Sequence, residues 1–131
     1  YKFEKCTNIR SYVPYPEIDQ DQVAKAAELI NSAKKPYILC GHGILLSEAQ
    51  QQLIELAEKG NIPVASTLLG LSAFPATHPL YVGYLGMHGN YGPNVLTNDC
   101  DVLIAIGMRF DDRVTGNVNT YAKQAKVVHI E

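Results

Sequence analysis

The feature that most constrains the fold is an uninterrupted apolar run over residues 102–106, which ends at Gly107. Such a run predicts a strand that is buried on both faces, as in a parallel sheet covered by helices. Glycine-rich segments lie before it, over 83–92, and after it, over 107–116. In open α/β sheets, ligands bind beyond the carboxyl ends of the strands. We therefore expect a ligand site beside this strand, with a solvated surface loop as the alternative for either segment alone.

The segment after this strand carries charges that suit an anionic ligand. Arg109 and Arg113 lie on either side of the adjacent residues Asp111 and Asp112. A guanidinium group donates two parallel, charge-assisted hydrogen bonds to phosphate oxygens, so these arginines suit a phosphate ligand. Surface Asp–Arg pairs are the simpler interpretation of the same residues, and such pairs contribute little stability.

Helices and strands alternate along the rest of the chain. Apolar residues at helical spacing predict helices over 19–35 and 47–60, and a short helix over 93–98. Short apolar runs predict buried strands over 37–40, 62–66, 102–106 and 126–130. Residues 67–92 are rich in glycine and proline, and we expect them to be irregular. The alternation indicates an α/β domain, with a doubly wound parallel sheet and helices on both faces.

Particular residues are expected to mark the helix ends. Asp19 is placed to cap the first helix. One face of that helix holds Val23, Ala26, Ala27 and Ile30. Ser47 and Gln50 have the spacing of a capping box at the start of the second helix, and Gly60 is placed to end it.

Composition bounds the function more than it reveals it. A chain of 131 residues is long enough for one domain, with residues 1–18 as an interdomain linker and 19–131 as the folded part. The net charge of −2 and the absence of a basic patch give no indication of binding to nucleic acid or to an acidic membrane. No signal peptide and no apolar run of membrane-spanning length is present.

The cysteines and histidines do not form a recognisable site. Cys6, Cys40 and Cys100 are odd in number and far apart, which disfavours a disulfide framework and favours a reducing location, the cytoplasm or a eukaryotic organelle. Cys40 and Cys100 are expected to be buried as small apolar side chains. The four histidines lack metal-ligand spacing, so no metal site is expected.

The chain has no initiator methionine and stops directly after the run over 126–130. A parallel strand is normally followed by a covering helix. We therefore expect the chain to be part of a longer polypeptide, with its sheet truncated at the C-terminal end.

Gly41-His42-Gly43 follows a predicted strand, as a dinucleotide-binding fingerprint would. The third glycine position holds Leu46, however, and no acidic residue ends the next strand near Ser66. A nicotinamide site of the Rossmann type is therefore disfavoured. From the residues alone, a tight turn from strand to helix is the better interpretation.

Longer strings of residues resemble one family. The segments 85–89 (Leu-Gly-Met-His-Gly) and 104–116 (Ile-Ala-Ile-Gly-Met-Arg-Phe-Asp-Asp-Arg-Val-Thr-Gly) closely resemble the large subunit of acetolactate (acetohydroxyacid) synthase. The resemblance continues through residues 67–71, 73–80 and 125–131, and it is weaker before about residue 60. It implies that residues 19–131 are the Rossmann-like central domain of a thiamine-diphosphate enzyme.

The resemblance also implies that this domain binds FAD. Physically, the thioether of Met87 suits a flat ring, and a carboxylate at Glu131 suits sugar hydroxyls. His42 replaces the middle residue of a run of three glycines in the family, and Arg113 matches an arginine at the substrate channel of the neighbouring subunit. The implied FAD-binding residues are Gly41, Gly43, Thr67, Leu68, Leu69, Leu85, Gly86, Met87, His88, Gly89, Gly107, Arg109, Asp111, Arg113, Val114 and Glu131.

What the resemblance implies about activity concerns a longer enzyme. That enzyme condenses two 2-oxo acids, pyruvate with pyruvate or 2-oxobutyrate, with loss of CO2 in branched-chain amino-acid biosynthesis. Thiamine diphosphate and Mg2+ belong to its other domains, and no catalytic residue is expected in this one. A homo-oligomer and a small regulatory subunit are implied for the full chain. The alternative is a non-catalytic nucleotide-binding or subunit-interface module of a related thiamine-diphosphate enzyme without FAD.

Overall fold

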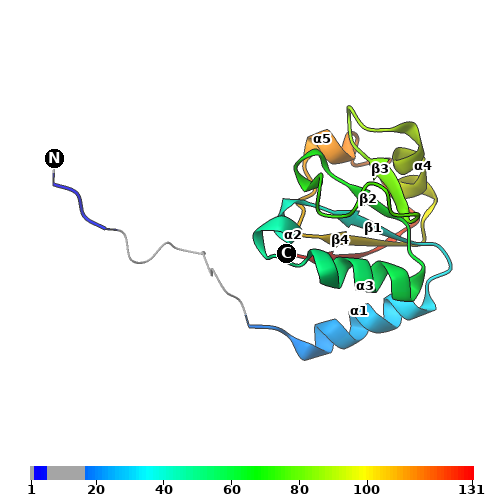
Figure 1. Ribbon diagram of the computed structural model, residues 1–131, viewed down its shortest axis with the longest axis horizontal. Helices are drawn as coiled ribbons and strands as arrows, with labels where there is room; N and C mark the ends of the chain where they lie inside the picture. Colours follow the sequence, from blue (N-terminus) through cyan, green and yellow to red (C-terminus); the bar gives the residue numbers. More distant parts are fainter. Residues whose placement is uncertain (1, 6–16) are drawn as a thin grey trace.

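The computed structural model describes residues 2–5 and 17–131. Five strands between Pro36 and Ile130 form one parallel sheet (Figure 1). Its strands are β1 (Pro36–Cys40), β2 (Val64–Ser66), β3 (Tyr81–Tyr84), β4 (Val102–Ile106) and β5 (Lys126–Ile130). They lie in the order β3-β2-β1-β4-β5. The predicted parallel α/β fold is thereby confirmed. The predicted linker over 1–18 falls mostly outside the described residues.

Helices cover both faces of the sheet (Figure 1). Successive side chains of β1 and β4 belong to two different cores, one on each face. On one face lie α1 (Gln20–Ser32), α2 (His42–Leu46) and α3 (Gln50–Gly60), which pack on a core that includes Ile38, Cys40 and Ile104. On the other face, α4 (Tyr91–Asp99) and α5 (Asp112–Thr115) contribute to a core around Tyr37, Leu39 and Leu103. Alternation of this kind is what a strand buried on both faces requires.

The most apolar strands lie where the sequence predicts them. β4 and β5 have the expected bounds, β1 begins one residue early, at Pro36, and β2 begins two residues late, at Val64. The prediction that β5 is buried is wrong, because Val128 is its one buried residue. Asp19 caps α1 as predicted, because its carboxylate accepts hydrogen bonds from the amides of Asp21 and Gln22. The face predicted for α1 is only partly confirmed. Val23 is 52% exposed, and none of the residues of α1 is fully buried.

Two predicted helix caps, at Ser47 and Gly60, are wrong. Ser47 does not start a helix but ends α2, an additional short helix, and its hydroxyl donates to the carbonyl of Gly43 at 2.7 Å. The next helix, α3, begins at Gln50 without a side-chain cap. Gly60 is the last residue of α3, as predicted, but the cap is Asn61, which adopts the left-handed conformation with φ 48°. Asparagine tolerates that conformation better than most residues do, which explains why glycine is not needed there.

Strand β3 was not predicted, because residues 67–92 were expected to be irregular. The strand lies at the edge of the sheet, where it pairs with β2. All four of its residues are half-buried, and its sequence, Tyr-Val-Gly-Tyr, contains no run of aliphatic residues that would predict a strand. A hydroxyl pair, Ser66 Oγ and Tyr81 OH at 2.8 Å, reinforces its pairing. The short turn η1 (Leu68–Gly70) also lies in this region, and α4 begins two residues before Pro93, at Tyr91.

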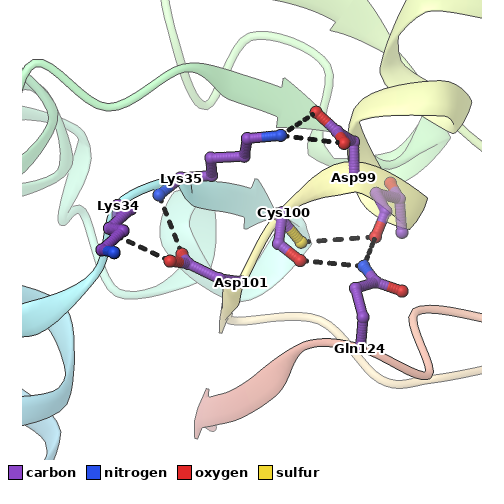
Figure 2. A network of polar contacts seen from close by, with 7 residues as sticks. Lys34, Lys35, Asp99, Cys100, Asp101 and Gln124 are labelled. Carbon is purple, nitrogen blue, oxygen red and sulfur yellow. Dashed lines mark hydrogen bonds and ion pairs between the residues drawn. The ribbon is translucent and has the colours of Figure 1, made fainter.

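Polar contacts hold together the segments at the amino ends of the strands (Figure 2). The carboxylate of Asp101 accepts hydrogen bonds from the amides of Lys34 and Lys35 at 2.7 and 2.9 Å. These hydrogen bonds lower the pKa of the Asp101 carboxyl group, and the bond from the amide of Lys34 has the largest effect. The Nζ atom of Lys35 lies 3.0 Å from Asp99, and Nε2 of Gln124 donates to the carbonyl of Cys100 at 2.8 Å. Hydrogen bonds and an ion pair therefore join the segments that precede β1, β4 and β5.

Candidate functional site

The residues predicted to bind FAD all follow the carboxyl ends of the five parallel strands, a region we call the carboxyl edge. Gly41 and Gly43 follow β1, Thr67, Leu68 and Leu69 follow β2, and Leu85, Gly86, Met87, His88 and Gly89 follow β3. Gly107, Arg109, Asp111, Arg113 and Val114 follow β4, and Glu131 follows β5. Sixteen residues named from five separate segments thus share one edge of the sheet.

The segments after β1 and β4 pack backbone against backbone. The amide of Gly43 donates to the carbonyl of Gly107 at 2.8 Å, and that of Gly41 donates to Ile106 at 2.9 Å. A Cβ atom built on Gly43 would lie 2.6 Å from the Cα atom of Gly107, which itself has a φ of +59°. This close packing is sufficient to explain why glycine is needed at these positions, even if no ligand binds there. The predicted tight turn from strand to helix is confirmed.

The segments after β1 and β2 are also joined. The amide of Thr67 donates to the carbonyl of Cys40 at 2.9 Å, and the hydroxyl of Thr67 accepts from the amide of Gly70 at 3.1 Å. His42 reaches across from α2, where its Nδ1 atom lies 3.1 Å from the carbonyl oxygen of Leu69. Nothing in the sequence indicates that last contact, since it joins residues from different segments.

The segment after β3 reaches that after β4, although β2 and β1 lie between these strands. The amide of Met87 donates to the carbonyl of Arg113 at 2.8 Å. Neighbouring strands lie about 4.8 Å apart, so β3 and β4 are separated by roughly 14 Å. The segments 85–89 and 107–116 together span this distance along the carboxyl edge. The side chain of Leu85 is buried in the core, so any ligand contact at this residue would use its main chain.

Both arginines at the edge are exposed and only loosely paired. Arg109 lies 3.4 Å from Asp111, and Arg113 lies 3.9 Å from Asp112, with side-chain exposures of 82% and 72% for the arginines. Pairs as exposed as these contribute little stability and leave the guanidinium groups accessible. Asp111 has a structural role besides, because its carboxylate accepts from the amide of Arg113 at 2.8 Å and so caps α5.

Large apolar side chains are exposed along the same edge. Leu68, Leu69 and Met87 are 63%, 71% and 63% exposed. At the end of β5, Nε2 of His129 donates to the carbonyl of Met108 at 2.7 Å and lies 3.5 Å from the exposed carboxylate of Glu131. The carboxyl edge thus combines accessible guanidinium groups, apolar side chains and a carboxylate, which together suit a ligand with phosphate, aromatic and sugar parts.

Other features of the described residues lie away from this edge. One hollow of about 440 Å³ lies between α3 and residues 71–76, and another of about 310 Å³ lies at the amino ends of β1 and β2; neither is lined by a predicted FAD-binding residue. Within residues 2–5 and 17–131 there is no cluster of three or more His, Cys, Asp or Glu side chains placed to hold a metal ion. In that same part of the chain, no helix is both long and apolar enough to cross a membrane.

Comparisons with known proteins agree with this geometry. Residues 23–131 match a family model described as the thiamine pyrophosphate enzyme, central domain. The chain is 40% identical over 131 residues to the acetolactate synthase large subunit of Haemophilus influenzae, covering 100% of this chain and 23% of that protein. It is 41% identical over 131 residues to the acetolactate synthase isozyme 3 large subunit of Escherichia coli, again covering 100% and 23%.

An archaeal relative is more similar over a shorter stretch. The chain is 49% identical over 110 residues to the probable acetolactate synthase large subunit of Methanocaldococcus jannaschii, covering 84% of this chain and 19% of that protein. The chain therefore spans about a fifth of the length of these relatives.

Proposed function

The chain belongs to the family of thiamine pyrophosphate enzyme central domains, and from that membership we propose that it is the FAD-binding central domain of an acetolactate synthase large subunit. The supporting observation is that five segments resembling the FAD contacts of that enzyme meet at the carboxyl edge of one parallel sheet. This is the edge at which open α/β sheets bind their ligands.

The side chains at the carboxyl edge fit the parts of FAD. Arg109 and Arg113 are accessible and suit the pyrophosphate. Met87 suits the flat isoalloxazine ring, since its exposed thioether is polarizable, and Leu68 and Leu69 add apolar surface. Glu131, exposed after β5, suits hydroxyl groups. The family resemblance implies that FAD is mostly a structural requirement, so its binding would not make this domain an oxidoreductase.

We infer the activity of the whole enzyme from the same relatives. It condenses two 2-oxo acids with loss of CO2, and thiamine diphosphate supplies the carbanion chemistry while Mg2+ helps to hold it. Neither is assigned to this domain. A homo-oligomer and a small regulatory subunit are proposed for the full chain. Residues 19–131 are the domain, and 1–18 the linker that leads into it.

A related enzyme domain without FAD is the second candidate. Two observations favour it. The packing between the segments after β1 and β4 explains their glycines without any ligand. The histidine at position 42 also replaces a glycine of the family resemblance at this turn. Fold alone does not distinguish the candidates, because related domains keep it with and without a cofactor.

The substitution Arg109→Ala in the full-length enzyme tests the proposal. Loss of one charge-assisted hydrogen bond costs about 1.5–3 kcal/mol, so FAD affinity is expected to fall roughly tenfold to a hundredfold. Lys34→Ala is the control, because Lys34 is exposed near the amino ends of the strands and uses its main-chain amide to contact Asp101. Flavin fluorescence is titrated with each protein. Equal affinities would place the pyrophosphate elsewhere, and an unaltered enzyme that binds no FAD would favour the second candidate.

A further inference from the structure

The side chain of His42 makes a long-range contact that joins two segments of the carboxyl edge. His42 is the first residue of α2 and is separated from the end of β1 by Gly41 alone. Its Nδ1 atom lies 3.1 Å from the carbonyl oxygen of Leu69 in η1. Because a carbonyl oxygen only accepts, Nδ1 carries the proton and donates it. The bond is possible for the neutral ring and for the imidazolium, since only Nε2 differs between them.

Other hydrogen bonds hold the residues on either side of Leu69, including one of 3.4 Å from the amide of Leu71 to the carbonyl of Leu68. The amide of Thr67 is bonded to Cys40, and the hydroxyl of Thr67 accepts from the amide of Gly70. Gly70 packs closely on the end of β1, where a Cβ atom would lie 2.5 Å from the carbonyl oxygen of Cys40. Within the described residues, His42 is the partner found for the carbonyl of Leu69.

The turn η1 carries two of the most exposed apolar side chains of the carboxyl edge. Leu68 and Leu69 are 63% and 71% exposed, so their positions are not fixed by packing against the core. Their positions depend instead on the backbone of the turn. The hydrogen bond from His42 to the Leu69 carbonyl fixes the orientation of the peptide group between Leu69 and Gly70.

We propose that His42 is a positioning residue, which holds the Leu68–Gly70 turn against α2 and so orients Leu68 and Leu69 toward the ligand at the carboxyl edge. This inference rests on the proposed function, because the ligand is taken to be FAD. The side chain acts through the backbone of Leu69 and not through a contact with the flavin. Without it, the turn is more mobile, and ligand binding must order the turn at a cost in affinity.

Three substitutions in the full-length enzyme separate this role from others. His42→Ala removes the donor. His42→Asn keeps an N–H donor at the position of Nδ1, whereas His42→Gln places its donor near Nε2. Hydrogen exchange of the peptide 67–72 is measured by mass spectrometry without FAD, and FAD affinity is measured by fluorescence titration.

The alanine variant is expected to exchange about fivefold faster over residues 67–72, the change that corresponds to one net hydrogen bond. Its FAD affinity is expected to fall about three- to tenfold. The asparagine variant should restore both quantities and the glutamine variant neither. Equal exchange in the alanine variant and the unaltered enzyme would overturn the proposal, and so would equal rescue by asparagine and glutamine. If the unaltered enzyme binds no FAD, the proposed function fails, and the exchange measurement alone decides whether His42 holds the turn.

Discussion

Cys40 and Cys100 illustrate how burial determines the chemistry of single residues. Both are buried, and burial raises the pKa of the Cys40 thiol to about 12 and that of the Cys100 thiol to about 11. Because the thiolate is the reactive form, we expect neither residue to be alkylated by iodoacetamide at pH 7.5 in the folded protein. Both should react fully in denaturant. Peptide mapping after labelling measures each site, and rapid modification of Cys40 in the native protein would contradict its burial.

Asp101 gives a prediction with a defined pH dependence. Hydrogen bonds from the amides of Lys34 and Lys35 lower its pKa below the ordinary 3.8. The stabilisation by the carboxylate is therefore complete above the unfolded-state pKa and is lost as the pH falls through the lower folded-state pKa. Asp101→Asn should lower the free energy of unfolding at pH 7, and the difference between pH 7 and pH 3 should shrink relative to the unaltered protein. Urea titrations at both pH values measure the free energy of unfolding. If it changes equally between pH 7 and pH 3 in the variant and in the unaltered protein, Asp101 does not cause the pH dependence.

At the scale of elements, the packing of the turn after β1 against the segment after β4 depends on glycine. A Cβ atom on Gly43 would lie 2.6 Å from the Cα atom of Gly107, and backbone cannot move aside as a side chain does. Gly43→Ala should therefore destabilise the domain by about 1–3 kcal/mol, the usual cost of overpacking. Gly92→Ala is the matched control, because a Cβ atom there meets nothing within 4 Å and alanine favours the helix α4. Denaturant unfolding compares the two, and an equally stable Gly43→Ala variant would contradict the close packing.

The elements that could be predicted from the sequence are those with strong local signals. β1 and β4 are buried apolar runs, and Asp19 is a favoured cap, so each is recognisable without tertiary information. β3 is an edge strand in which tyrosine and glycine are half-buried, and its pairing with β2 depends on contacts that no local pattern contains. Ser47 fits the pattern of a capping box but serves α2, since a short helix takes up the preceding residues.

The candidate site shows the same division. The resemblance gives its residues, and parallel strands bring their carboxyl ends to one edge, so the grouping follows from the fold class. The contacts between segments do not follow from it. The bond from Met87 to Arg113 and that from His42 to Leu69 each join segments after different strands, and only the folded chain brings them together.

At the scale of the whole molecule, the two ends of the sheet differ in how their polar groups are used. At the amino ends of the strands, Asp101, Asp99 and Gln124 bind other parts of the same domain (Figure 2). At the carboxyl edge, arginines, leucines and Met87 remain exposed. The first end stabilises the fold, and the second offers surface to a ligand. This difference supports our proposal that FAD binds at the carboxyl edge and not in the hollow lined by Lys34 and Lys35.

The last prediction concerns the reaction itself. If this chain is the central domain, the resemblance assigns thiamine diphosphate, Mg2+ and the catalytic residues of the synthase to its other domains. The 131-residue chain alone should then form no acetolactate above background from pyruvate with thiamine diphosphate, Mg2+ and FAD, whereas the full-length enzyme should form it readily under the same conditions. A colorimetric assay for acetoin after acid decarboxylation measures the product. Turnover by the isolated chain would place catalytic groups within it and would overturn the assignment of this domain as the cofactor-binding part of a longer enzyme.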